Sequence, residues 1–224
     1  SRRVAQPFDL SDPGFVADPY AALAAARAGG PIVWHDGLGE WVTTSHAAAN
    51  DVLRDRRLGR IFRPRATSDD DAWTTFDWLH ADSILDSEPP KHTRLRRLVS
   101  GAFGRGHIER MRPRIEELAD GLLDGVVARL HSDGRVDVIE HYAEPLPVLV
   151  ICELLGAPTE DWKRLRDWSQ AMVTMYEVAP SLQAQQDAQR ACADFAAYVE
   201  QLAVERAAAP GDDLLTSLVQ ERDG

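Results

Sequence analysis

The stretch "SEPPKHTRLRRLVSGAF", residues 87–103, places one histidine and three arginines among leucine, valine and phenylalanine, directly after two prolines. Prolines tend to end one segment and to begin the next, so a helix is predicted from about Lys91. On a helical wheel the apolar residues of this helix share one face, which is the predicted core face: Leu95, Leu98, Val99 and Ala102. The cations of the stretch therefore lie at different angles to a buried side.

These cations divide into two kinds. Arg94 and Arg97 point away from the core face and are expected in solvent. His92 and Arg96 lie one turn apart, about 40° from each other on the wheel, at the shoulder of that face. Arg96 is therefore predicted to be half-buried, where a guanidinium needs an anion close by. A carboxylate of the protein or a carboxylate of a ligand would serve, and spacing alone leaves both open.

Composition limits the class of protein. The chain has 224 residues and a net charge of −11, which argues against broad binding of nucleic acid. Its longest apolar run, "PLPVLVIC" (145–152), is too short for a membrane span, and the N-terminus lacks the hydrophobic region of a signal peptide. The two cysteines match no metal-site spacing. We expect a soluble, cytoplasmic monomer.

Periodicity and punctuation predict a mainly α-helical protein with a small β-hairpin near its start. The expected helices cover 18–30, 46–55, 109–130, 145–155, 160–175, 182–208 and 213–222. The expected strands cover 31–35, 40–44 and a short stretch at 135–138. The predicted N-caps are Asp18, Ser45, Thr159 and Asp212. Residues 56–85 show no clear pattern and are predicted to be a long connection.

Three stretches resemble one family. "LDSEPPKHTRLRRLVSGAF" (85–103) resembles the helix C region of bacterial cytochrome P-450 enzymes, the haem-thiolate monooxygenases. Residues 18–55 are similar to the family's helix A, first β-hairpin and helix B, and "VLVICELLGAPTEDW" (148–162) is similar to its helix E and the start of helix F. The resemblance implies that residues 1–224 are the N-terminal half of a single cytochrome P-450 domain, helices A to H with the hairpin.

The resemblance also implies a cofactor site. The family's histidine and second arginine, which hold the haem propionates, match His92 and Arg96, and Phe103 matches a phenylalanine that packs near the haem. The implied cofactor is haem b with an axial cysteine thiolate. The family's cysteine loop and helix I match nothing here, so we expect them beyond Gly224. Cys152 and Cys192 are expected to be structural, as buried cysteines usually are.

Two segments match the substrate-covering parts of the family. The B–C loop corresponds to Trp73, Phe76, Trp78, Ile84 and Leu85, and the F–G turn to Met172, Met175 and Tyr176. An ordinary hydrophobic core is the alternative interpretation of both sets. The remaining histidines are expected at the surface or at helix caps: His35, His46, His80, His107, His131 and His141.

The resemblance predicts a haem-dependent monooxygenase of secondary metabolism. It would oxidise a medium-sized apolar or aromatic metabolite with O2 and with electrons from a ferredoxin-type donor. Lys91, Arg94 and Arg97 would help to dock that acidic donor, although plain surface charge is the alternative for each of them. Two other hypotheses stay open: a non-catalytic helical ligand-binding protein on the same scaffold, and oxidative coupling in place of hydroxylation.

Overall fold

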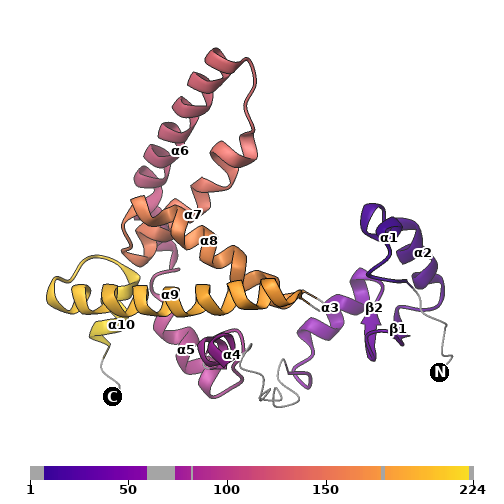
Figure 1. Cartoon of the computed structure of the whole chain (residues 1–224). Coiled ribbons are helices and arrows are strands. Elements are labelled where there is room, and N and C mark those ends of the chain that lie inside the picture. The colour runs from indigo at the N-terminus through magenta and orange to yellow at the C-terminus, as the bar shows by residue number, and fades with distance from the viewer. Residues whose placement is uncertain (1–7, 60–73, 82, 178–179, 222–224) are drawn as a thin grey trace. The chain divides into compact units, whose positions relative to one another are not determined.

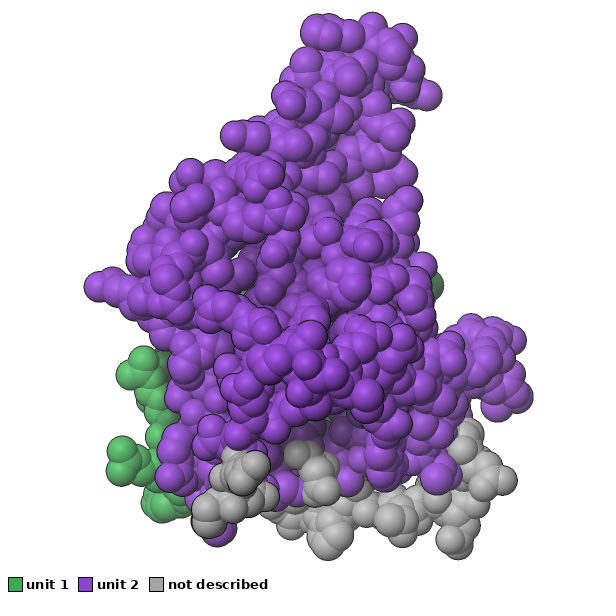
Figure 2. All heavy atoms as spheres, turned by 90° about the vertical axis from the view of Figure 1, so that its left-hand side faces the viewer, with its two compact units in different colours: residues 1–60 green, residues 61–224 purple. Residues whose placement is uncertain are grey.

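The computed structural model describes residues 8–59, 74–81, 83–177 and 180–221. Within these ranges the chain is mainly helical and has one two-stranded antiparallel sheet, which confirms the predicted fold class. The chain divides into two compact units, residues 1–60 and residues 61–224, which Figure 2 shows in different colours. That residues 1–224 belong to a single domain stays a prediction. None of the described helices is long and apolar enough to cross a membrane.

Unit 1 is built around the predicted hairpin (Figure 1). Its elements are α1 (Pro13–Ala17), α2 (Tyr20–Ala28), β1 (Ile32–His35), β2 (Glu40–Thr43) and α3 (His46–Arg54). In the sheet, Ile32 lies opposite Thr43 and His35 opposite Glu40. Ser45 caps α3 as predicted, because its hydroxyl accepts a hydrogen bond from the N–H of Ala48 at 3.2 Å.

Unit 2 holds the longer helices (Figure 1). Its elements are α4 (Thr74–Ala81), α5 (Lys91–Ser100), α6 (Arg105–Asp133), the π-helix η2 (Ile139–Ala143), α7 (Pro145–Leu155), η3 (Thr159–Asp161), α8 (Trp162–Val173), η4 (Thr174–Tyr176), α9 (Leu182–Ala208) and α10 (Leu214–Gln220). Helix α6 extends beyond its predicted range at both ends, and α9 has its predicted bounds. Helix α4 lies in the stretch for which no pattern was found.

The strand predicted at 135–138 does not form. The carboxylate of Asp137 instead accepts hydrogen bonds from the N–H groups of Ile139 and Glu140, at 2.9 and 3.1 Å, and so starts a helical turn. The prolines Pro145 and Pro147 lack the N–H groups that would bond back into this turn. A wider π-turn, closed by Glu144 N–H to the carbonyl of Ile139 at 2.9 Å, results.

Three of the predicted caps are also wrong. The N-cap of α2 is Pro19, although the carboxylate of Asp18 accepts a hydrogen bond from the N–H of Tyr20 at 3.2 Å. Thr159 begins a 3-10 turn and makes no side-chain cap. The last helix is capped by Asp213 rather than Asp212, through a hydrogen bond from the N–H of Thr216 to its carboxylate at 2.7 Å. The helix begins at Leu214, so the carboxylate of Asp213 is the one that reaches the free N–H groups of the first turn. The sequence "GDDL" does not show at which residue the helix begins.

Two hydrophobic clusters hold unit 2 together. The first joins α7, α8 and α9 and contains Cys152, Ala157, Leu165, Tyr198 and Leu202. The second joins α4, η4 and α9 and contains Phe76, Met175, Ala188 and Cys192. Helix α7 buries Leu149, Cys152 and Leu154 but exposes Ile151. Burial of α4 on α9 therefore connects parts of the chain that are more than a hundred residues apart.

A polar junction joins the ends of α7 and α9 to the start of α10. Gly156 ends α7 with φ +81°, a left-handed conformation that glycine adopts readily. Arg206 donates to the carbonyl oxygen of Gly156, and its Nε lies 2.9 Å from the carboxylate of Asp213. The Asp213 side chain is almost fully buried and also caps α10. Its cap and its ion pair therefore depend on the small size of Gly156.

Candidate functional site

Helix α5 carries the predicted haem-contacting residues. Leu95, Leu98 and Val99 are half-buried, which confirms the face that the wheel predicted. Arg94 and Arg97 are exposed, also as predicted. Arg96 is exposed as well, so its predicted half-burial is wrong. The reason is that few neighbouring side chains pack on α5, since none of its residues is fully buried.

His92 and Arg96 stand one helical turn apart on α5, so their side chains lie on the same side of it. Within the described ranges, neither the His92 ring nor the Arg96 guanidinium takes part in a hydrogen bond or ion pair with protein. The alternative in which a protein carboxylate neutralises Arg96 is therefore not realised in the described chain. Phe103, just beyond the helix, is 57% exposed. The three residues offer two donors and an aromatic ring to a ligand.

The second predicted site gathers around Phe76. This ring is fully buried against Met175, and Met172 packs at the edge of the same cluster. The Tyr176 ring meets the Phe76 ring edge-on, with 5.8 Å between ring centroids. The structure thus brings together residues of the two segments that were predicted to cover the substrate. Phe76 and Met175 are core residues here, as the alternative interpretation held, whereas Tyr176 is 50% exposed.

The other predicted lining residues lie apart from this cluster. Trp78 is 61% exposed, because a residue two positions from Phe76 points to the opposite side of a helix. Ile84 and Leu85 follow α4 in a turn, where Ile84 is half-buried and Leu85 exposed. Trp73 lies outside the described residues. The substrate role of each of these residues stays a prediction.

His80 belongs to the Phe76 cluster, although its sequence context suggested a surface or capping residue. Its ring stacks on Phe76 with a centroid distance of 3.9 Å, and it meets the Tyr176 ring edge-on at 6.0 Å. The spacing of four between Phe76 and His80 places both on one face of α4. That spacing was visible in the sequence, but the helix was not predicted there.

The two cysteines behave as hydrophobic residues. Cys152 and Cys192 are fully buried, one in each cluster. Burial raises the pKa of the Cys152 thiol from 9.0 to about 11, with a smaller contribution from Asp161. Burial alone raises the pKa of the Cys192 thiol to about 11. Neither thiol is suited to bind a metal as a thiolate, which supports the structural role expected for both.

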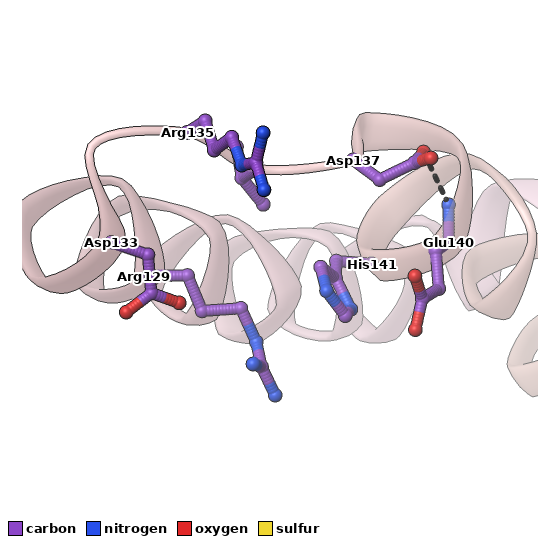
Figure 3. Close-up of a pocket in the computed structure, with 7 residues that line it drawn as sticks. Arg129, Asp133, Arg135, Asp137, Glu140 and His141 are labelled. Carbon is purple, nitrogen blue, oxygen red and sulfur yellow. Dashed lines mark hydrogen bonds between the residues drawn. The ribbon is translucent and has the colours of Figure 1, made fainter.

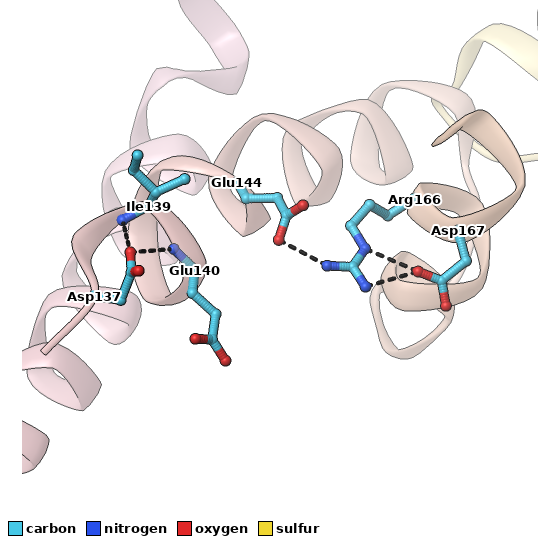
Figure 4. Close-up of polar contacts among 6 residues, drawn as sticks. All are labelled: Asp137, Ile139, Glu140, Glu144, Arg166 and Asp167. Carbon is cyan, nitrogen blue, oxygen red and sulfur yellow. Dashed lines mark hydrogen bonds and ion pairs between the residues drawn. The ribbon is translucent and has the colours of Figure 1, made fainter. Parts of the chain in front are cut away.

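A charged hollow of about 640 Å³ lies beside η2, and none of the predicted site residues lines it (Figure 3). Its lining residues include Arg129, Arg135, Glu140 and His141. Figure 4 shows that charged groups near it have local structural roles. Asp137 accepts hydrogen bonds from the first N–H groups of η2, while Arg166 pairs with Glu144 and with Asp167, at 2.7 Å each. Mixed charges of this kind select no one ligand class.

Several known proteins resemble this chain in sequence. No family model matches the chain. Cytochrome P-450 monooxygenase PikC from Streptomyces venezuelae is 37% identical over 212 residues, which cover 93% of this chain and 48% of that protein. Vitamin D(3) 25-hydroxylase from Pseudonocardia autotrophica is 35% identical over 221 residues, 96% of this chain and 51% of that protein. The chain thus spans about half the length of the curated relatives it matches.

The similarity extends to three dimensions. The crystal structure of P450BioI in complex with an acyl carrier protein matches with a TM-score of 0.82 at 26% identity, over 93% of this chain and 53% of that one. The crystal structure of CalO2 matches with a TM-score of 0.78 at 28% identity, over 96% of this chain and 53% of that one. Sequence and structure agree on the relatives, and the chain belongs to the bacterial cytochrome P-450 family.

Proposed function

We propose that this chain supplies the propionate-binding face and part of the substrate wall of a cytochrome P-450 monooxygenase. The observation that carries the proposal is the pair His92 and Arg96 on α5, which have no polar partner in the described chain and stand beside a half-covered apolar face. A haem has the matching character, because its two carboxylates project from an apolar ring. Arg gives a carboxylate two parallel hydrogen bonds, and His adds another donor from the same side.

The donor set fits the edge of a haem but not its axial ligand. Leu95, Leu98 and Phe103 provide apolar surface next to the two donors. Cys152 and Cys192 are buried in other clusters as neutral thiols, so neither is proposed as the thiolate. When bound, such a haem supplies the activation of O2. The part assigned to this chain is to bind and orient it.

Haem retention tests the proposal without depending on turnover. In the haem-loaded protein, Arg96→Leu removes a charge-assisted hydrogen bond of about 1.5–3 kcal/mol, so haem loss to apomyoglobin should become about 10- to 150-fold faster. His92→Phe should act in the same direction, but more weakly. Arg97→Leu is the matched control, because this exposed arginine lies on the outer face of α5. Unchanged retention in both Arg96→Leu and His92→Phe would contradict the propionate assignment.

The substrate is proposed to be a medium-sized, largely apolar or aromatic metabolite, oxidised with O2. The accessible part of the Phe76 cluster supports this, since the half-exposed Tyr176 ring and the partly buried Met172 thioether lie over the buried Phe76 ring. The name of one relative, a vitamin D(3) 25-hydroxylase, points to a substrate of the same character for that protein. Hydroxylation is therefore the reaction that we favour.

The electron donor is proposed to be an acidic protein of the ferredoxin type. Residues 91–114 contain one lysine and seven arginines but a single glutamate, in a chain whose net charge is −11. Some of these charges are paired locally, such as Arg112 with Glu109 at 3.1 Å. Arg97 on the outer face of α5 is exposed and has no ion pair in the described chain. A basic segment on an acidic protein favours encounter with an acidic partner through long-range attraction.

A further inference from the structure

The His80 ring is held in place by two contacts that serve different parts of it. Its face stacks on the fully buried Phe76 ring, with 22° between the two ring planes. Its Nδ1 lies 2.8 Å from the backbone carbonyl oxygen of Phe76, one turn earlier on α4. Phe76 is itself fixed, because its N–H donates to the side-chain oxygen of Gln189 on α9 at 2.8 Å. The imidazole is therefore positioned by the core of unit 2.

This geometry determines which nitrogen carries the proton. A carbonyl oxygen only accepts hydrogen bonds, so Nδ1 must be the donor. In the neutral ring the other nitrogen, Nε2, then has no hydrogen and is an acceptor. In the part of the chain that the structure describes, no group donates a hydrogen bond to Nε2. Among the described residues, the Nε2 atom of His80 is thus an acceptor in a fixed position with no donor from the protein.

The Nε2 acceptor of His80 lies in a largely apolar cluster that reaches the surface. Tyr176 meets the ring edge-on at 6.0 Å and is half-exposed, so the cluster reaches the surface of unit 2 at this point. Besides the imidazole and the Tyr176 hydroxyl, the described side chains of the cluster consist of ring, methyl, thioether and thiol groups. In such a setting a single positioned polar group discriminates strongly between ligands, because a ligand that lacks a donor leaves the Nε2 acceptor unpaired.

We infer that His80 is a specificity-determining residue of the substrate wall: its Nε2 accepts a hydrogen bond from a hydroxyl or ammonium group on an otherwise apolar or aromatic substrate. This inference rests on the proposed function, since it assigns the Phe76 cluster to substrate. It narrows the proposed substrate class from medium-sized apolar or aromatic molecules in general to those that also carry a hydrogen-bond donor.

The experiment compares 4-phenylphenol with its methyl ether, 4-methoxybiphenyl, in which a methyl group replaces the hydroxyl hydrogen, by equilibrium dialysis against the haem-loaded protein. The wild type should bind the phenol about tenfold more tightly than the ether. His80→Phe retains an aromatic ring for the stack but has no acceptor, so the ratio should fall to about one through weaker binding of the phenol. His131→Phe, an exposed histidine on α6, is the matched control and should keep the wild-type ratio.

Equal affinities in the wild type, binding of neither probe, or an unchanged ratio in His80→Phe would each overturn the inference. A second measurement does not depend on how well the variant folds. In the protein without ligand, the nitrogen chemical shifts of the neutral His80 ring should show a protonated Nδ1 and an unprotonated Nε2. The opposite tautomer would also overturn the inference. Failure of haem retention in the wild type would instead count against the proposed function.

Discussion

Replacing Gly156 by alanine should destabilise the protein far more than the change of one methyl group suggests. Gly156 has φ +81°, and the left-handed conformation costs about 1–2 kcal/mol for a residue with a Cβ atom. An added Cβ would also lie 2.3 Å from Cγ of Asp213, which is too close for both atoms to stay. Moving Asp213 breaks its cap on α10 and its ion pair with Arg206, together about 2–3 kcal/mol. The expected total is about 3–5 kcal/mol.

Gly134 offers a matched control. It also ends a helix, α6, in the left-handed conformation, with φ +70°, but no heavy atom lies within 4 Å of a Cβ built there. Gly134→Ala should therefore cost only the conformational part, about 1–2 kcal/mol. The difference between the two variants isolates the contact with Asp213.

Urea unfolding followed by circular dichroism measures both losses, and thermal midpoints should follow at about 2–4 °C per kcal/mol for a chain of this size. A double-mutant cycle sharpens the test, because Asp213→Gly removes the atoms that clash. In that background Gly156→Ala should cost no more than Gly134→Ala does in the wild type. Equal destabilisation by Gly156→Ala and Gly134→Ala would refute the steric reasoning.

Three further predictions concern charge, pH and packing. Reversing Arg94 and Arg97 to glutamate should slow electron delivery to the haem-loaded protein, most strongly at low salt. A reduction rate that does not change with ionic strength would mean that these arginines are ordinary surface charges with no docking role. Because burial raises the pKa of the Cys152 and Cys192 thiols from 9.0 to about 11, their contribution to stability is complete below about pH 8 and is lost as pH rises toward 11; urea midpoints that stay flat from pH 8 to 10.5 would argue against it. Phe76→Ala should lower stability by about 3–5 kcal/mol, and a loss under 1 kcal/mol would mean that α4 is not docked through this ring.

Local features of the sequence were enough to predict much of this fold. The hairpin and the bounds of α9 depend on residues close together in the chain, and the structure has both. The apolar face of α5 was also predicted correctly from helical spacing. Features of this kind depend on residues within one or two helical turns of each other, so the sequence alone indicates them.

Features that depend on distant residues were not predicted. Arg96 has the spacing of a half-buried residue, but its exposure depends on what covers α5. Helix α4 has little amphipathic pattern of its own, and its stability comes from Phe76 packing on α9. The role of His80 followed from that docking, so it could not be inferred while α4 was unrecognised. Tertiary contacts decide such cases, and a single sequence does not display them.

The hydrogen bond from the Phe76 amide to Gln189 joins residues 113 positions apart. Closing so long a loop is entropically expensive, so α4 should acquire protection late in folding, after α8 and α9 have paired with each other. During synthesis on the ribosome, α4 would leave the exit tunnel long before Gln189, the acceptor for the Phe76 N–H, has been synthesised. Hydrogen exchange at the Phe76 amide therefore reports when α4 docks on α9. Its exchange with deuterium should remain fast until α9 has formed, and should then slow in a single step.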